Sequence, residues 1–278
     1  MRLGAGNEVF DALPAHVVQR TGGHLREVYV VERGGRLVEE LGPLSRAALR
    51  AALAASGVAP AEGQRAEVCL AAPALVARLA RVLRRGYVLA FDYGALDWAA
   101  FVAARPRGTL RTFAGHAPGG DPLARPGEID VTYHVDFGAL VRAAQAAGLA
   151  VAGVTTQRAF LTRLGWRAYL AALPGVAPAT AYEANAYALR YLVREDGLGG
   201  FLVLGLAAGG APPTLSGFRG AAEPQADLLA RARAGTLPVP LLTPDHAPLL
   251  AARRPAALDF GELWADLTPA GDADEPAR

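Results

Sequence analysis

Asn7, Glu8 and Asp11 lie in the segment NEVFDALP near the start of the sequence, and their side chains are of types that bind a cation or move a proton. An amide oxygen accepts a hydrogen bond from an amine or a guanidinium, and a carboxylate holds a positive charge or accepts a proton. The same residues also suit a simple turn in which the aspartate caps the backbone. The residues alone leave both interpretations open.

Two further polar groups follow apolar runs. Asp92 and Tyr93 come directly after YVLAF at 87–91, and Gln157 follows the run at 149–154. Ligands of an α/β sheet bind at the carboxyl ends of its strands, so these positions predict side chains that face a site. The structural alternatives are a turn-forming aspartate before Tyr-Gly and a glutamine that caps the next helix.

His134 and Asp136 form a His-x-Asp pair within GEIDVTYHVD. On an extended segment both side chains lie on one face, which is compatible with a metal, and His116 and Asp121 could extend such a set. A metal-dependent enzyme is therefore a further alternative. The spacing is loose, however, so no metal site is predicted. Asp136 is expected to cap a helix at 137–147 and His134 to line an acceptor cleft.

Apolar runs and helical patterns alternate through much of the chain, and this predicts an α/β fold with a mainly buried sheet. The expected strands are 87–91, 149–154 and 200–206, and the expected helices are 137–147, 158–173 and 179–194. Near the start, β-rich runs flank Gly34-Gly35 within 24–41, which predicts a hairpin. Helices are expected at 46–56 and 62–85.

The composition excludes several classes of protein. With 52% hydrophobic and 19% charged residues the chain can bury a core. Its formal charge of +2 gives no strong electrostatic field that would attract nucleic acid. No apolar run approaches the roughly 18 residues of a membrane span, and no secretory signal is recognisable, so a cytoplasmic location is expected. The lone Cys69 excludes an intramolecular disulfide. No serine lies in a G-x-S-x-G segment, which argues against a hydrolase.

Four segments of unusual residue choice carry a resemblance to one family. They are NEVFDALP at 7–14, DYG at 92–94, the run from PGE-x-D-x-T to HVDF at 126–137, and TTQ at 155–157. Over roughly residues 7–220 the chain resembles the MidA family of class I S-adenosylmethionine-dependent methyltransferases. The resemblance implies a Rossmann-like sheet and S-adenosylmethionine as cofactor.

The resemblance also implies roles for individual residues. The implied catalytic residues are Asn7, Glu8 and Asp11, of which the first two would lie beside the methyl donor or acceptor and the third would shape their loop. The implied substrate contacts are Asp92, Tyr93, His134, Asp136 and Gln157. The implied cofactor contacts are Gly4, Gly6, Asn7 and Glu8, because LGAG at 3–6 is similar to the start of the family's glycine motif.

In the family a cofactor-binding half precedes NEVFDALP, which here begins at residue 7. We therefore expect an N-terminally truncated class I methyltransferase sheet with an inserted hairpin and helical segment at about 22–60. The partial methyltransferase domain would span 1–220, and a Pro-rich extension with a disordered tail would span 221–278. The remaining strands would carry an exposed edge.

The implied activity is methylation of a protein side chain, arginine in particular, because mitochondrial relatives methylate arginine during assembly of a respiratory complex. A protein substrate is therefore expected, with a respiratory complex subunit as one candidate. A homo-oligomer or a sheet-completing partner would cover the exposed edge, and neither nucleic acid nor a membrane span is expected. The alternative to an enzyme is a non-catalytic remnant that serves as an interaction or assembly module.

Overall fold

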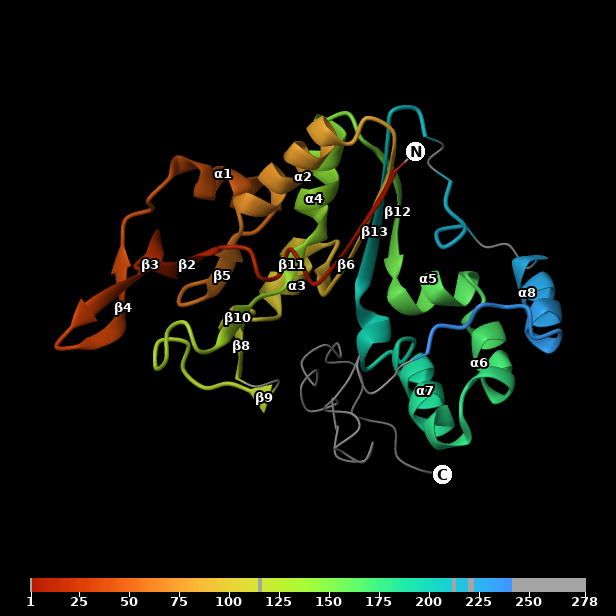
Figure 1. Cartoon of the computed structure of the whole chain (residues 1–278). Helices are drawn as coiled ribbons and strands as arrows, with labels where there is room; N and C mark the ends of the chain where they lie inside the picture. Colours follow the sequence, from red (N-terminus) through yellow and green to blue (C-terminus); the bar gives the residue numbers. More distant parts are fainter. Residues whose placement is uncertain (1, 115–116, 212–213, 220–222, 242–278) are drawn as a thin grey trace, which may run out of the picture. The chain divides into compact units, whose positions relative to one another are not determined.

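The computed structural model describes residues 2–114, 117–211, 214–219 and 223–241 (Figure 1). The chain divides into two units. The first comprises residues 1–153 and 204–213, and the second comprises residues 154–203 and the chain from 214 onward. None of the described helices is long and apolar enough to cross a membrane.

The central sheet has four strands in the order β1-β6-β13-β12. Their bounds are β1 Arg2–Asn7, β6 Gly86–Asp92, β12 Ala150–Thr156 and β13 Leu202–Ala208. β1 runs parallel to β6, with Arg2 opposite Gly86 and Asn7 opposite Phe91. The predicted strands at 87–91, 149–154 and 200–206 are therefore present, and the class is mixed α/β.

Helices α2 (Ala71–Val82) and α4 (Phe137–Ala146) pack against each other in the first unit (Figure 1). As predicted, Asp136 caps α4, because its carboxylate accepts a hydrogen bond from the N–H of Ala139 at 2.7 Å. Phe137, Leu140 and Ala144 form the buried stripe of the helix. The helix that precedes β6 and the helix that precedes β12 therefore lie against each other.

A second four-stranded sheet, in the order β4-β3-β2-β5, occupies the predicted insertion. The bounds are β2 His16–Thr21, β3 His24–Arg33, β4 Arg36–Gly42 and β5 Arg65–Val68. The hairpin turn falls at Gly34-Gly35, where φ values of 60° and 78° require glycine. The sheet extends beyond the expected bounds of 22–60, because β2 pairs with the hairpin strand β3 and β5 pairs with β2.

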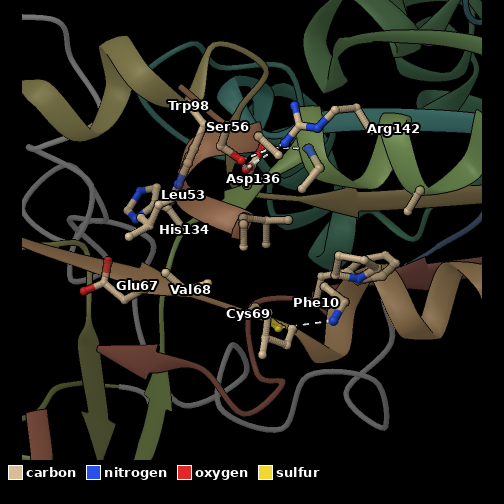
Figure 2. Close-up of a pocket in the computed structure, with 18 of the residues that line it drawn as sticks. Phe10, Leu53, Ser56, Glu67, Val68, Cys69, Trp98, His134, Asp136 and Arg142 are labelled. Carbon is tan, nitrogen blue, oxygen red and sulfur yellow. Dashed lines mark hydrogen bonds and ion pairs between the residues drawn. The ribbon is translucent and has the colours of Figure 1, made fainter. Parts of the chain in front are cut away.

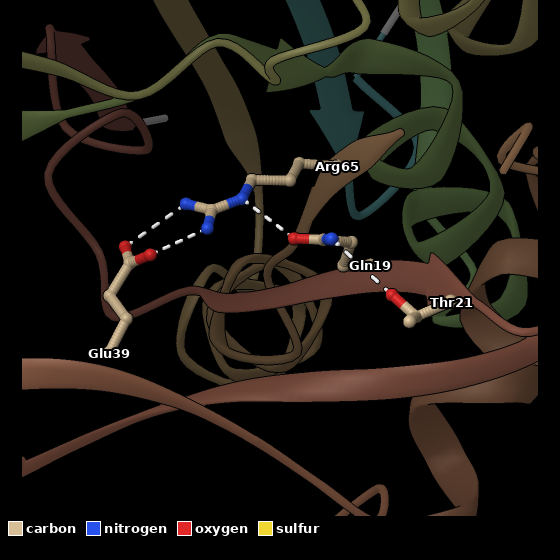
Figure 3. Close-up of polar contacts among 4 residues, drawn as sticks. All are labelled: Gln19, Thr21, Glu39 and Arg65. Carbon is tan, nitrogen blue, oxygen red and sulfur yellow. Dashed lines mark hydrogen bonds and ion pairs between the residues drawn. The ribbon is translucent and has the colours of Figure 1, made fainter. Parts of the chain in front are cut away.

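The two faces of this second sheet differ in polarity. Val18 and Ala66 pack against Leu49 and Leu53 of α1 (Ala47–Ala55), which confirms the predicted helix at 46–56. On the opposite face Arg65 donates to Gln19 at 3.0 Å and to both carboxylate oxygens of Glu39 (Figure 3). This network links β5, β2 and β4 across the sheet.

The predicted helix at 62–85 is wrong in its first part. Residues 65–68 form β5, which pairs antiparallel with β2, and only 71–82 are helical. Ala66, Glu67 and Val68 are all buried. The burial of three consecutive residues fits a strand that is enclosed on both faces. A search for helical periodicity does not detect such a strand.

Short elements complete the first unit. They are β7 Gly94–Ala95, α3 Trp98–Ala103, β8 Arg111–Ala114, β9 Ala117–Pro118, β10 Asp130–Thr132 and β11 Val135–Asp136. β7 pairs with β11, and β10, β8 and β9 form a small sheet. The pairing of β7 with β11 joins the segment after β6 to the segment that contains His134.

The second unit contains five described helices. They are α5 Gln157–Arg163, α6 Trp166–Val176, α7 Ala179–Tyr191, the 3-10 helix Leu198–Gly200 and α8 Glu223–Arg233. The single helix predicted at 158–173 is wrong, because Gly165 has a φ of 80° and ends one helix before the next begins. Most of the predicted C-terminal tail, 242–278, lies outside the described residues.

Candidate active site

A sharp turn follows β1 and carries the predicted acidic residues. Glu8 has a φ of 49° and is the only non-glycine residue in the left-handed region among those described. Its N–H donates to the carbonyl oxygen of Phe91 at 2.9 Å, and its carboxylate accepts from the amide of Asn7 at 2.9 Å. Asn7 and Glu8 are both exposed, so their polar ends are available at the end of the strand.

Asp92 lies at the end of β6 beneath this turn and is completely buried. Its Oδ2 accepts from the backbone N–H groups of Val9, Phe10 and Asp11 at 3.2, 2.9 and 3.3 Å. Its Oδ1 accepts from the N–H of Tyr93 at 3.0 Å. Both oxygens are therefore engaged by the protein, and the predicted substrate contact gains no support from this conformation.

Asp11 faces Tyr93 in the same buried cluster. The Tyr93 hydroxyl donates to Asp11 Oδ2 at 2.6 Å, whereas Asp11 Oδ1 is buried and has no hydrogen-bond partner. Burial raises the pKa of Asp11, and the hydrogen bond from Tyr93 opposes this. Burial, followed by the nearby charge of Asp11, raises the pKa of Asp92 to about 7.

His134 lies against the rings of Tyr93 and Phe101, with centroid distances of 5.1 Å in both cases. The side chain is buried, and neither ring nitrogen has a hydrogen-bond partner. Burial, followed by the charges of Arg105 and Arg111, lowers the pKa of His134 to about 3. The imidazole is therefore neutral at pH 7. It lies close to the acidic cluster because Tyr93 touches both.

Asp136 belongs to a different group. Besides capping α4, its carboxylate accepts from the Ser56 hydroxyl and lies 3.6 Å from the Arg142 guanidinium. This group borders a pocket of about 410 Å³ in the first unit. In Figure 2 the Ser56, Asp136 and Arg142 side chains lie on one side of the pocket, and Phe10 and Cys69 lie on the opposite side.

Most of the pocket wall is apolar, and the sequence did not predict several of its residues. Glu67 lines it, although both of its carboxylate oxygens accept from the backbone N–H of Thr109. Glu67 could not be anticipated because its segment was predicted to be helical. Leu53 lies in the helix expected at 46–56, whose apolar positions indicated core and not a cavity, and no helix was expected at Trp98.

The remaining predicted residues lie elsewhere. Gly4 and Gly6 lie inside β1, and neither has a positive φ. They therefore do not form a glycine turn, and their role in cofactor binding stays a prediction. Gln157 belongs to the second unit, where its side chain is buried and donates to the carbonyl oxygen of Leu192 at 2.9 Å. Thr156, and not Gln157, caps α5.

The described residues form neither a cluster of metal ligands nor a glycine-rich cradle for a nucleotide-like cofactor. Among them no three His, Cys, Asp or Glu side chains converge on one point, and His116 lies outside the described range. Nor does any described strand run into a helix through a glycine-rich turn of the kind that cradles such a cofactor. The described part of the chain therefore contains carboxylates near the end of β1 but not that cradle.

Comparison with protein families gives a match over residues 3–155 to a model described as "Putative S-adenosyl-L-methionine-dependent methyltransferase". The mitochondrial protein arginine methyltransferase NDUFAF7 of Mus musculus is 33% identical over 169 residues, which are 57% of this chain and 34% of the relative. NDUFAF7 of Danio rerio is 34% identical over 166 residues, or 57% and 36% of the two chains. The chain thus spans about a third of the length of the curated relatives it matches.

Two solved structures from Burkholderia thailandensis are similar in fold. An uncharacterized COG1565 superfamily protein is 33% identical with a TM-score of 0.71, and the match covers 78% of this chain and 58% of that one. A COG1565 superfamily member bound to S-adenosyl-homocysteine is also 33% identical, with a TM-score of 0.70 and coverage of 78% and 56%. The fold of this chain is therefore similar to more than half of each structure.

Proposed function

This chain belongs to the MidA-like family of S-adenosylmethionine-dependent methyltransferases, and from this premise we propose that it forms the acceptor side of a site that methylates arginine in proteins. The observation that carries the proposal is the placement of Glu8 and Asp11 at the end of β1, where Asn7 and Tyr93 orient their carboxylates. A guanidinium is a planar cation that carboxylates bind with paired hydrogen bonds. The names of the similar NDUFAF7 proteins support arginine as the acceptor.

The chain's own residues have two tasks in this proposal. Glu8, which is exposed, binds and orients the incoming guanidinium, and Asp11 receives the proton that the guanidinium must lose. Asp11 is suited to this because burial raises its pKa and Oδ1 has no hydrogen-bond partner within the protein. His134, which packs against Tyr93, is neutral and so adds no positive charge of its own beside the cluster.

S-adenosylmethionine is the methyl donor of the family, and it would supply an activated methyl group. The described residues do not fit this cofactor completely, because the glycine cradle is not among them. We therefore assign to them only the binding of the acceptor and the acceptance of its proton.

Two measurements test the proposal. Calorimetric titration with S-adenosyl-homocysteine establishes whether this chain binds the cofactor product, with micromolar affinity expected for an active enzyme. Transfer of labelled methyl from S-adenosylmethionine to an arginine-containing protein, followed by mass spectrometry of the product, identifies the acceptor. Glu8→Gln and Asp11→Asn should each lower transfer by about 100-fold. The exposed carboxylate variant Glu128→Gln serves as the matched control and should leave transfer unchanged.

A second candidate function is a non-catalytic interaction or assembly module that keeps this part of the fold. It is favoured by the lack of a glycine cradle among the described residues. A folded sample that binds neither S-adenosylmethionine nor S-adenosyl-homocysteine would support this module and contradict the methyltransferase. Methylation of lysine or of a small molecule would contradict the choice of arginine alone.

A further inference from the structure

The Asp92 carboxylate is bound by four backbone N–H groups and is completely inaccessible to solvent. Three of these donors are consecutive and belong to residues 9–11, the turn that follows β1. The fourth belongs to Tyr93, whose hydroxyl binds Asp11 in that same turn. A single side chain of β6 thus determines the backbone path of a segment about 80 residues earlier in the sequence.

The turn needs such an anchor because of its conformation. Glu8 has a φ of 49°, a conformation that is strained for a non-glycine residue and persists only where the surrounding structure holds it. A residue in the left-handed region also directs the following N–H groups toward one point, which forms a concave anion site. Here the anion is the carboxylate of Asp92.

We propose that Asp92 is a positioning residue, which holds residues 8–11 in the strained turn that places the exposed Glu8 carboxylate and the buried Asp11 carboxylate at the end of β1. This assignment replaces the predicted substrate contact, because both carboxylate oxygens are already occupied by the protein. The role of the two presented carboxylates rests on the proposed function, whereas the anchoring of the turn does not depend on it.

The anchor is sensitive to protonation. The ionisable groups that surround it are Asp11 and Glu8 on the turn, Tyr93 after β6, and Tyr133 and His134 on the segment before α4. The Tyr133 hydroxyl donates to the carbonyl oxygen of Phe10 at 2.9 Å and so contacts the same turn. Because the pKa of Asp92 is raised to about 7, its proton is exchanged near neutral pH. A protonated carboxyl accepts N–H groups less strongly, so the turn loosens as pH falls below that value.

The first test uses the unmodified protein and NMR spectroscopy. The side-chain carboxyl carbon of Asp92 and the backbone amides of Val9, Phe10 and Asp11 should titrate with one common midpoint. If the carboxyl titrates while these amides stay unchanged, or if the amides follow another group, the proposal is overturned. This arm needs no substitution and no activity.

The second test compares Asp92→Asn with Glu67→Gln, a matched variant in which another buried carboxylate loses its bonds to a backbone N–H. Asparagine keeps the shape but replaces one oxygen with a donor. Amide hydrogen exchange at residues 9–11 should become about tenfold faster in Asp92→Asn and remain unchanged in Glu67→Gln, in which Thr109 should respond instead. Unchanged exchange at residues 9–11 in a folded Asp92→Asn protein overturns the proposal. If that variant does not fold, the titration of the unmodified protein decides.

Activity gives a separate readout. If the chain transfers methyl groups, Asp92→Asn should lower kcat. The difference in kcat between the unmodified protein and Asp92→Asn should change with pH at the midpoint that NMR gives for the turn. If the chain has no methyltransferase activity, the proposed function fails while the exchange and titration results still decide the role of Asp92.

Discussion

At the scale of single residues, burial is the main influence on the charges of the acidic cluster and its neighbour His134. Burial raises the pKa of both Asp11 and Asp92 and lowers that of His134. Removal from water disfavours the charged form of each group, so acids keep their protons longer and the imidazole gives its proton up sooner. The cluster therefore has less charge at neutral pH than its residue types suggest.

His134 should make folding stability depend on pH. The pKa of its side chain is lowered to about 3 in the folded protein, whereas an unfolded histidine has its ordinary value near 6.5. Acidification therefore protonates the unfolded chain first, and the contribution of His134 is complete above about pH 6.5 and is lost as pH falls toward 3. Between pH 7 and pH 5 the loss is about 2 kcal/mol.

Denaturant unfolding of His134→Leu at both pH values measures this contribution. The difference in unfolding free energy between pH 7 and pH 5 should shrink by the stated amount relative to the unmodified protein. The two proteins must be compared because Asp92, whose pKa is raised in the folded state, makes folding more stable as pH falls, opposite to His134. An unaltered slope in His134→Leu would show that the imidazole is not held neutral.

The charge of Asp11 should be measurable at Asp92. Asp11 is the second cause of the raised pKa of Asp92, after burial, because two carboxylates in one site repel each other. Asp11→Asn removes this charge and should lower the pKa of Asp92 below about 7, as followed by carboxyl NMR signals. The exposed Asp130→Asn should have no such effect. A rise after Asp11→Asn would show that the charge of Asp11 does not raise the pKa of Asp92.

At the scale of elements, the start of α4 has a cap that also touches a second element. The carboxylate of Asp136 accepts from the N–H of Ala139 and from Ser56, which lies just after α1. Asp136→Ala should cost about 1–2 kcal/mol of unfolding free energy, whereas Asp136→Asn should lose less because its side chain still caps. Thermal unfolding measures both. Equal losses would show that the charge toward Arg142, and not the cap, provides the stability.

The pairing of β7 with β11 depends on Gly94, because a Cβ there would overlap the carbonyl oxygen of Val135. We expect Gly94→Ala to destabilise the protein by about 3 kcal/mol, since the clash is with backbone and cannot be relieved by a rotamer change. Gly120→Ala is the control, as a Cβ there meets open space, and its effect should stay within about 0.5 kcal/mol. A tolerated Gly94→Ala would mean that this short ladder is not as close as described.

At the scale of the whole molecule, β1 is the edge of the central sheet, and Leu3 on it is 66% exposed. Unpaired strand edges invite pairing with another chain, and a charge on the edge opposes it. We expect Leu3→Lys to reduce self-association in sedimentation velocity without lowering the melting temperature. Leu41→Lys, at an exposed leucine of the second sheet, provides the comparison. If both variants sediment like the unmodified protein, the edge does not drive association.

The sequence by itself determined the class of the fold, the family and most of the elements. Continuous apolar runs, the glycine pair of the hairpin and the capping aspartate of α4 are local signals, and each predicted its element correctly because the cause lies within a few residues. The helix expected at 62–85 failed for the opposite reason. Residues 65–68 are held as a strand by pairing with β2, and the local sequence does not reveal that contact.

Only the tertiary structure decided what each candidate residue does. Asp92, Asp11 and His134 were all chosen as polar groups near strand ends, but their environments give them different tasks. Asp92 binds the backbone of a distant turn, Asp11 keeps a free oxygen, and His134 is enclosed by rings and neutral. The residues that bury these side chains and bind them come from segments far apart in the sequence, such as Phe10 for Asp92 and Phe101 for His134. The charge and role of these side chains therefore follow from the folded arrangement and not from residue type or spacing.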